Sequence, residues 1–203
     1  MYREQKLIGK MRKLICLLAL VCTTSPFLFG QCEIAFNEVD EFDQVRTIAA
    51  NHVNIGYMIP SLFETENGPK IIEQGKAMFM YSEKDSISSF FLLLAIPEYS
   101  YHPIDSGQNV LIKLSDNEEG VIALHNFPDN GQFDKTTNMR VYSHACVIPL
   151  DLFYRLADAS IEKIRINYNK KKQTLTLSKK QQEALRAAVE CVGREAGVYP
   201  VKP

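Results

Sequence analysis

The pair His144 and Cys146 is the arrangement in this sequence that comes closest to a catalytic one. Two positions apart in an extended segment, the imidazole and the thiol would point to the same face of a strand. A thiol beside an imidazole can act as a nucleophile. The alternative is a structural histidine next to a buried or disulfide-linked cysteine. Because nothing else in the spacing supports catalysis, we assign no catalytic residue from the sequence.

Other motifs of recognisable chemistry are absent from the sequence. It contains no G-x-S-x-G, no H-E-x-x-H and no glycine-rich phosphate loop. It has neither C-x-x-C nor a Cys/His cluster that would suit zinc. The segment from Asp129 to Asp134 departs from the EF-hand calcium loop, and a turn explains it better. We therefore predict no metal and no cofactor, and we favour a protein without enzymatic activity.

Tyr99, Tyr101 and His102 form the aromatic cluster of a predicted loop that runs from Pro97 to Gly107. Exposed aromatic rings often mark a binding surface. These three residues are therefore the candidate ligand-binding residues. The chain has no Trp, which argues against a surface built for stacking on sugars.

Residues 1–30 have the organisation of an export signal. Arg12 and Lys13 precede an apolar run, residues 14–21, that is too short to span a bilayer comfortably. Gly30 is a small residue of the kind that precedes a signal cleavage site, so we expect cleavage between Gly30 and Gln31. We therefore expect an exported protein, in the periplasm, on the cell surface or secreted, with no transmembrane span after cleavage.

Two details of this segment stay open. Met11 lies directly before the basic pair, so residues 1–10 fit a misassigned start. Cys32 raises the possibility of lipidation, but a lipobox needs a small residue where the chain has Gln31. We therefore do not expect a lipoprotein.

Three cysteines, Cys32, Cys146 and Cys191, remain after the signal is removed. An oxidising compartment makes one disulfide plausible between two of them, with one thiol left over. The sequence leaves the three pairings open. A bridge from Cys32 is favoured because it would hold the new N-terminus in place.

The rest of the chain has the pattern of strands joined by turns. Segments rich in β-branched and aromatic residues predict about eight strands, with clear hairpins over 110–125 and 164–177. Residues 90–96 are apolar on both faces, which predicts a strand buried on both sides at the centre of the sheet. Segments 61–75 and 126–138 have the composition of loops.

Two helices are expected among these strands. Pro149 opens a short internal helix. Ser178 and Gln181 form a capping box that starts a C-terminal helix, and Gly193 is placed to end it. The predicted fold class is α+β, mainly β: an antiparallel curled sheet or sandwich with one short internal helix and the C-terminal helix packed on it. We expect one exported domain over 31–193 and a flexible tail over 194–203.

The segment from Asp151 to Val192 resembles the C-terminal part of short uncharacterised secreted proteins of Bacteroidota. The similarity covers the sequence DLFYRL at 151–156, the strand IEKIRI at 161–166 and the capped helix that follows. It is a structural pattern of hairpin and helix. The resemblance implies export in such bacteria and no activity that could be carried over to particular residues.

The function expected from the sequence is that of an exported accessory or binding domain of the bacterial envelope. Its partner would be an envelope protein or a polysaccharide. Nucleic acid is not expected, because the net charge is −1 and no basic face is evident. Two alternatives remain: a carrier that holds an apolar ligand in a curled sheet, suggested by residues 90–96, and an unrecognised hydrolase.

Overall fold

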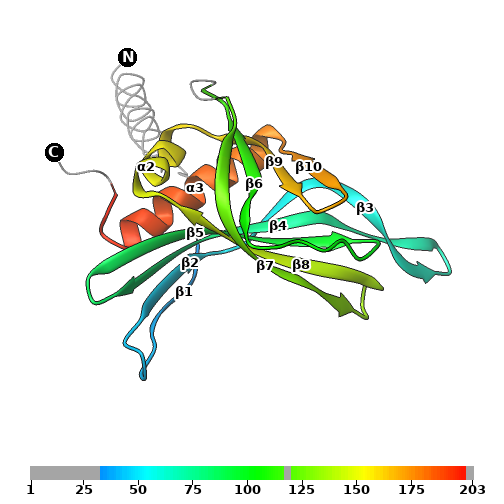
Figure 1. Cartoon of the computed structure of the whole chain (residues 1–203), viewed down its shortest axis with the longest axis horizontal. Coiled ribbons are helices and arrows are strands. Elements are labelled where there is room, and N and C mark those ends of the chain that lie inside the picture. The colour runs from blue at the N-terminus through cyan, green and yellow to red at the C-terminus, as the bar shows by residue number, and fades with distance from the viewer. Residues whose placement is uncertain (1–32, 117–119, 200–203) are drawn as a thin grey trace, which may run out of the picture. The chain divides into compact units, whose positions relative to one another are not determined.

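The computed structural model describes residues 33–116 and 120–199. The predicted export signal, its cleavage point and Cys32 lie outside these residues. Within them the protein is mainly β, with ten strands and two helices (Figure 1). The strands are β1 (Ile34–Val39), β2 (Arg46–Ala50), β3 (Val53–Thr65), β4 (Gly68–Lys84), β5 (Ile87–Glu98), β6 (Gly107–Leu114), β7 (Ile122–Asp134), β8 (Met139–Ile148), β9 (Ile161–Asn167) and β10 (Lys172–Thr176). The helices are α2 (Leu150–Asp158) and α3 (Lys179–Glu195).

All ten strands belong to a single antiparallel sheet. Their order is β1-β2-β4-β5-β8-β7-β6-β9-β10, and β3 pairs with the part of β4 that β2 leaves free. The sequence left a curled sheet and a sandwich open. The sandwich is wrong, and the single sheet is not strongly curled, since β1 and β10 do not pair with each other to close it.

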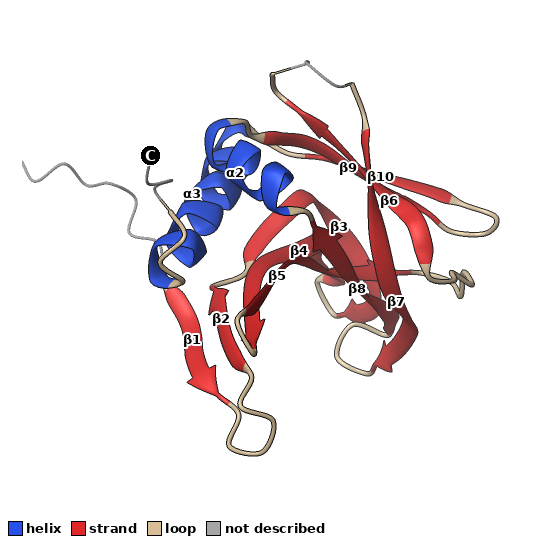
Figure 2. Ribbon diagram, turned by 60° about the vertical axis from the view of Figure 1, so that its left-hand side comes forward, coloured by secondary structure: helices blue, strands red, loops and turns tan. Residues whose placement is uncertain are grey.

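Both helices pack on the same face of this sheet (Figure 2). Ser178 accepts a hydrogen bond from the Gln181 amide and completes the predicted capping box of α3. The apolar stripe of this helix, Leu185, Ala188, Val189 and Val192, is buried against the sheet and α2. The predicted packing of a C-terminal helix on the sheet is therefore confirmed.

Strand β5 lies inside the sheet, between β4 and β8, as its apolar sequence predicts. Its residues alternate between two environments. Phe90, Leu92, Leu94 and Ile96 are buried in the core under the helices, whereas the side chains between them are only half-buried. The prediction of burial on both faces is wrong because the helices cover one face and leave the other open.

The two predicted hairpins exist as β6–β7 and β9–β10. The loops predicted over 61–75 and 126–138 are wrong, because most of these residues belong to β3, β4 and β7. Register shifts between Pro60 and Glu64 and between Asp129 and Gln132 accommodate the residues that suggested loops. Turn-forming residues are compatible with these strands because a β-bulge leaves an extra residue unpaired without ending the strand.

The end of the chain is more ordered than its composition suggests. Helix α3 continues to Glu195, and the amides of Val198 and Tyr199 then donate to the Gly193 carbonyl at 2.9 and 3.0 Å. Val198 and Tyr199 pack against the core. The flexible tail predicted over 194–203 is therefore folded up to residue 199, and residues 200–203 lie outside the described part of the chain.

No disulfide joins two of the described cysteines. Cys146 is a free, buried thiol, so both predicted pairings that include it are wrong. Cys191 is not a free thiol. The pairing of Cys32 with Cys191 therefore stays a prediction.

Non-reducing peptide mapping of the mature protein is expected to show Cys32 linked to Cys191. The bridge would close a very long loop, so Cys191→Ser should lower the free energy of unfolding by about 2–4 kcal/mol. Urea denaturation of the oxidised and reduced wild-type protein provides the control. A bridge from Cys191 to Cys16 or Cys22 would contradict the predicted removal of residues 1–30.

Candidate functional site

The predicted binding loop carries exposed rings but is held to its neighbours. Tyr99 and Tyr101 are 46% and 54% exposed. The Tyr99 hydroxyl donates to the Pro60 carbonyl at 2.7 Å, and Arg140 lies 5.2 Å from the centre of the Tyr101 ring. The backbone amide of His102 donates to the Tyr142 hydroxyl at 2.6 Å. These contacts attach the loop to β3 and β8, so its aromatic residues have structural roles.

His144 and Cys146 do share one face of β8, as their spacing predicts, but that face is the core. The Cys146 thiol donates to Asn126 Oδ1 at 3.9 Å, and the Asn126 amide donates to His144 Nδ1 at 3.1 Å. Burial raises the pKa of Cys146 to about 12 and lowers the pKa of His144 to about 4. At neutral pH both groups are therefore uncharged, and the thiol is not a nucleophile.

The buried His144 should make the protein sensitive to acid. Its imidazole stays neutral in the folded state, whereas in the unfolded chain it binds a proton below about pH 6.5. The stabilisation is complete above pH 6.5, and roughly 3 kcal/mol should be lost as the pH falls from 6.5 to 4. Urea denaturation of the wild-type protein and His144→Gln across this range tests the effect. Equal pH dependence of the two proteins would contradict it.

A partly buried ion pair lies near these residues at the end of β5. Glu98 is almost fully buried, and its Oε2 atom is bonded to Lys171 Nζ from the β9–β10 turn. Tyr168, which is buried beside Glu98, has its pKa raised by burial and by this carboxylate. The rings of His102, Tyr142 and His144 surround Tyr168 at centroid distances of 5.2 to 6.1 Å. Tyr142, His144 and Tyr168 are buried in the core.

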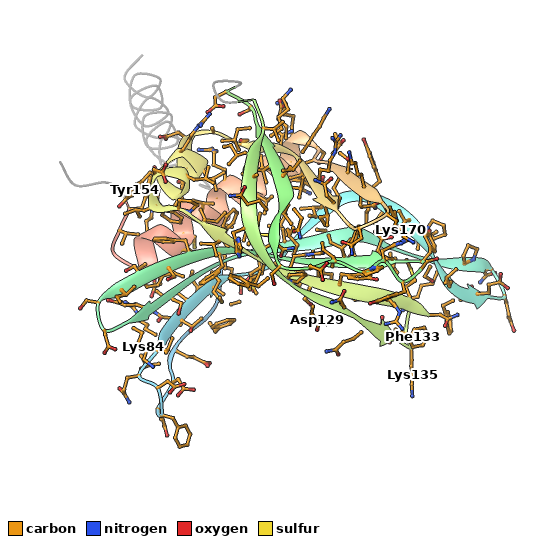
Figure 3. All side chains as sticks on the ribbon, in the orientation of Figure 1. Lys84, Asp129, Phe133, Lys135, Tyr154 and Lys170 are labelled. Atoms are coloured by element: carbon orange, nitrogen blue, oxygen red, sulfur yellow. The ribbon has the colours of Figure 1, made fainter. Side chains whose placement is uncertain are left out.

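The open face of the sheet carries a groove of about 570 Å³. It lies across β4, β5, β8 and β7, on the face opposite the helices. Cross-strand pairing places Met78 beside Leu93, Leu93 beside Ala145, and Ala145 beside Phe127. The next row of the same face runs from Lys76 through Ala95 and Ser143 to Asp129. Figure 3 shows Asp129 below the ribbon, with the helices above it.

The groove is a consequence of side-chain size. The side chains at the bottom of the groove are small: Ala95, Ser143 and Ala145. The larger side chains of Met78 and Phe127 form its walls. Phe127 is 53% exposed although it is a large apolar residue. His52, Lys76 and Asp129 add polar groups at the rim. The size and the mixture of apolar walls with few polar groups are those of a small-molecule site.

Three lining residues, Ser143, His52 and Asp129, are the types of a hydrolytic triad. Such a triad needs its members within hydrogen-bond reach of one another. No hydrogen bond joins any two of them in residues 33–116 and 120–199 as described, and β4 and β5 separate His52 from Ser143 on β8. The geometry therefore does not favour the hydrolase alternative.

A second, smaller hollow of about 240 Å³ adjoins the groove on the same face. The two share Lys76 and Ala95. The smaller hollow also contains Glu73, Asp134 and Thr137, so it is more polar than the groove.

The sequence missed these residues for an identifiable reason. The doubly apolar segment 90–96 suggested burial on both faces, or an apolar ligand held in a curled sheet, but it did not locate a groove at Leu93. Nothing in the sequence indicated that Ala145 and Phe127 lie beside it, because three separate strands bring them together.

In the described part of the chain, no group of three or more His, Cys, Asp or Glu residues could hold a metal ion. Neither of its helices is long and apolar enough to cross a membrane. Comparison with protein-family models, curated protein sequences and solved structures finds no match. The resemblance to secreted proteins of Bacteroidota therefore stays a prediction.

Proposed function

We propose that this protein is an exported binding domain that holds an apolar chain in the groove on the open face of its sheet. The observation that carries the proposal is the groove itself, which exposes Met78, Leu93 and Phe127 around a low floor of small residues. Burial of apolar surface in such a site would supply the binding free energy.

The proposal moves the expected binding surface from the loops to the sheet. Tyr99 is hydrogen-bonded to the Pro60 carbonyl, and Arg140 lies over the Tyr101 ring. By contrast, Met78 is half-buried and Phe127 is exposed on the open face of the sheet. It also favours the carrier alternative, although the ligand would lie on an open face and not inside a curled sheet. The export signal would place this activity in the envelope or outside the cell.

Binding of the neutral apolar dye Nile red tests the groove. We expect enhanced fluorescence with the wild-type protein and at least tenfold weaker binding with Ala145→Trp, because the indole would fill the floor. Ala145 lies on the face opposite the core, so this variant should keep the wild-type melting temperature.

Ala123→Trp is the matched control. Ala123 is exposed on β7, on the same face as Phe127, and does not line the groove. It should leave dye binding unchanged. Equal binding by wild type and Ala145→Trp would contradict the proposed site.

A further inference from the structure

The groove and the smaller hollow form one trough whose chemistry changes along its length. Lys76 and its cross-strand partner Ala95 border both of them. On one side of this row the lining is apolar, with Met78 and Leu93. On the other side Pro97 and Val141 pair across the strands, and the rim becomes polar. A ligand that occupied the whole trough would therefore need an apolar part and a polar part.

The polar part of the trough offers charges of both signs. Lys76 is exposed, and no ion pair of its ammonium is found within the described residues. Glu73 is bonded to Asn54 at 2.9 Å through one carboxylate oxygen. Asp134 accepts hydrogen bonds from the Thr136 amide and the Thr137 hydroxyl, at 2.9 and 2.8 Å. These bonds keep Asp134 ionised, since they lower its pKa.

The order of these charges along the trough is what selects a ligand. Lys76 lies at the junction with the apolar groove, whereas Glu73 and Asp134 line the smaller hollow alone. A chain that fills the groove would therefore meet Lys76 at one end of this row and Asp129 at the other, and only the carboxylates of Glu73 and Asp134 beyond it. A purely anionic head group would be opposed by three carboxylates, those of Asp129, Glu73 and Asp134, against one ammonium.

We infer that the trough binds a single-chain amphiphile whose head is zwitterionic, with its anionic group next to the tail and an amine at the far end. The apolar tail would lie over Met78, Leu93 and Ala145. The anionic group would face Lys76, and the amine would face Glu73 and Asp134. Lysophosphatidylethanolamine has this order of acyl chain, phosphate and amine. The inference rests on the proposed function, because the tail needs the apolar groove.

The test compares two amphiphiles that carry the same lauroyl tail, each below its critical micelle concentration. Calorimetric titration is expected to show that lauroyl lysophosphatidylethanolamine binds at least tenfold more tightly than the anionic lauroyl lysophosphatidylglycerol. Lys76→Met should weaken binding of the zwitterion about tenfold. Glu73→Gln and Asp134→Asn should each reduce the preference for the zwitterion. Glu73→Gln keeps an oxygen that can accept the Asn54 hydrogen bond. Asp134→Asn keeps an acceptor for only one of its two hydrogen bonds, because the Thr136 amide and the Thr137 hydroxyl donate to different oxygens.

Lys84→Met is the matched control, because Lys84 is exposed at the far end of β4 and lines neither hollow. It should bind both amphiphiles as the wild type does. Equal or tighter binding of the anionic amphiphile, or no effect of Lys76→Met, would overturn the inference and leave the proposed function standing. Failure of wild type to bind Nile red and both amphiphiles would overturn the two together.

Discussion

Leu185→Asp is expected to abolish cooperative folding under conditions in which the wild-type protein is folded. Leu185 is 1% exposed in the middle of α3, within the core between helix and sheet. The substitution would lose about 1.5–3 kcal/mol of apolar burial. It would also place a carboxylate where no basic partner is described, at a further cost of several kcal/mol. The sum is comparable with the 5–15 kcal/mol that typically separates folded from unfolded protein.

Circular dichroism during thermal unfolding measures this effect. Lys180→Asp introduces the same side chain at an exposed position of the same helix and should change stability by no more than about 0.5 kcal/mol. If Leu185→Asp melted like the wild type, α3 would not be packed on the sheet as described.

Lys171→Met is expected to destabilise the protein by about 2–3 kcal/mol. This is less than the roughly 3–5 kcal/mol found when one partner of a fully buried ion pair is removed, because the Lys171 side chain is 32% exposed. The Glu98 side chain is only 2% exposed, and its Oε1 atom has no hydrogen bond within the described residues. Among residues 33–116 and 120–199, Lys171 is the ionic partner of this carboxylate. Loss of the ammonium would leave a buried charge without compensation.

Chemical denaturation of four proteins isolates this interaction. The double variant Glu98→Gln/Lys171→Met should be more stable than Lys171→Met alone, because the buried charge is removed with its partner. Lys170→Met changes the neighbouring lysine of the same turn, which is exposed, and should be close to wild type. Equal stabilities of Lys170→Met and Lys171→Met would show that the ion pair is unimportant.

The role of Lys171 also shows where sequence patterns stop being informative. The run of lysines at 170–172 has the composition of a solvated turn, and Lys170 behaves in that way. Lys171 differs from its neighbour only in its position on the turn, which places its ammonium against a carboxylate 73 residues earlier in the chain. No local pattern distinguishes the two lysines.

The strands illustrate the same limit. The β6–β7 and β9–β10 hairpins follow from alternation and turn residues within a few positions, and both were predicted. The segments 61–75 and 126–138 were predicted as loops because Pro, Gly and Asn are frequent there. They are strands because β3 pairs with β4 within and beside the first segment and β7 pairs with β8 in the second, and this pairing outweighs local preference.

The sequence by itself determined the mainly β class, the single C-terminal helix with its capping box, and the apolar stripe of Leu185, Ala188, Val189 and Val192. Each of these depends on residues close together in the chain, where spacing alone fixes which side chains share a face. Only the tertiary structure decided which face of β5 would remain open, that Ala95, Ser143 and Ala145 would meet to form a groove, and that Glu98 would face Lys171. These features depend on strand order and register, which bring distant residues together and which local pattern does not encode.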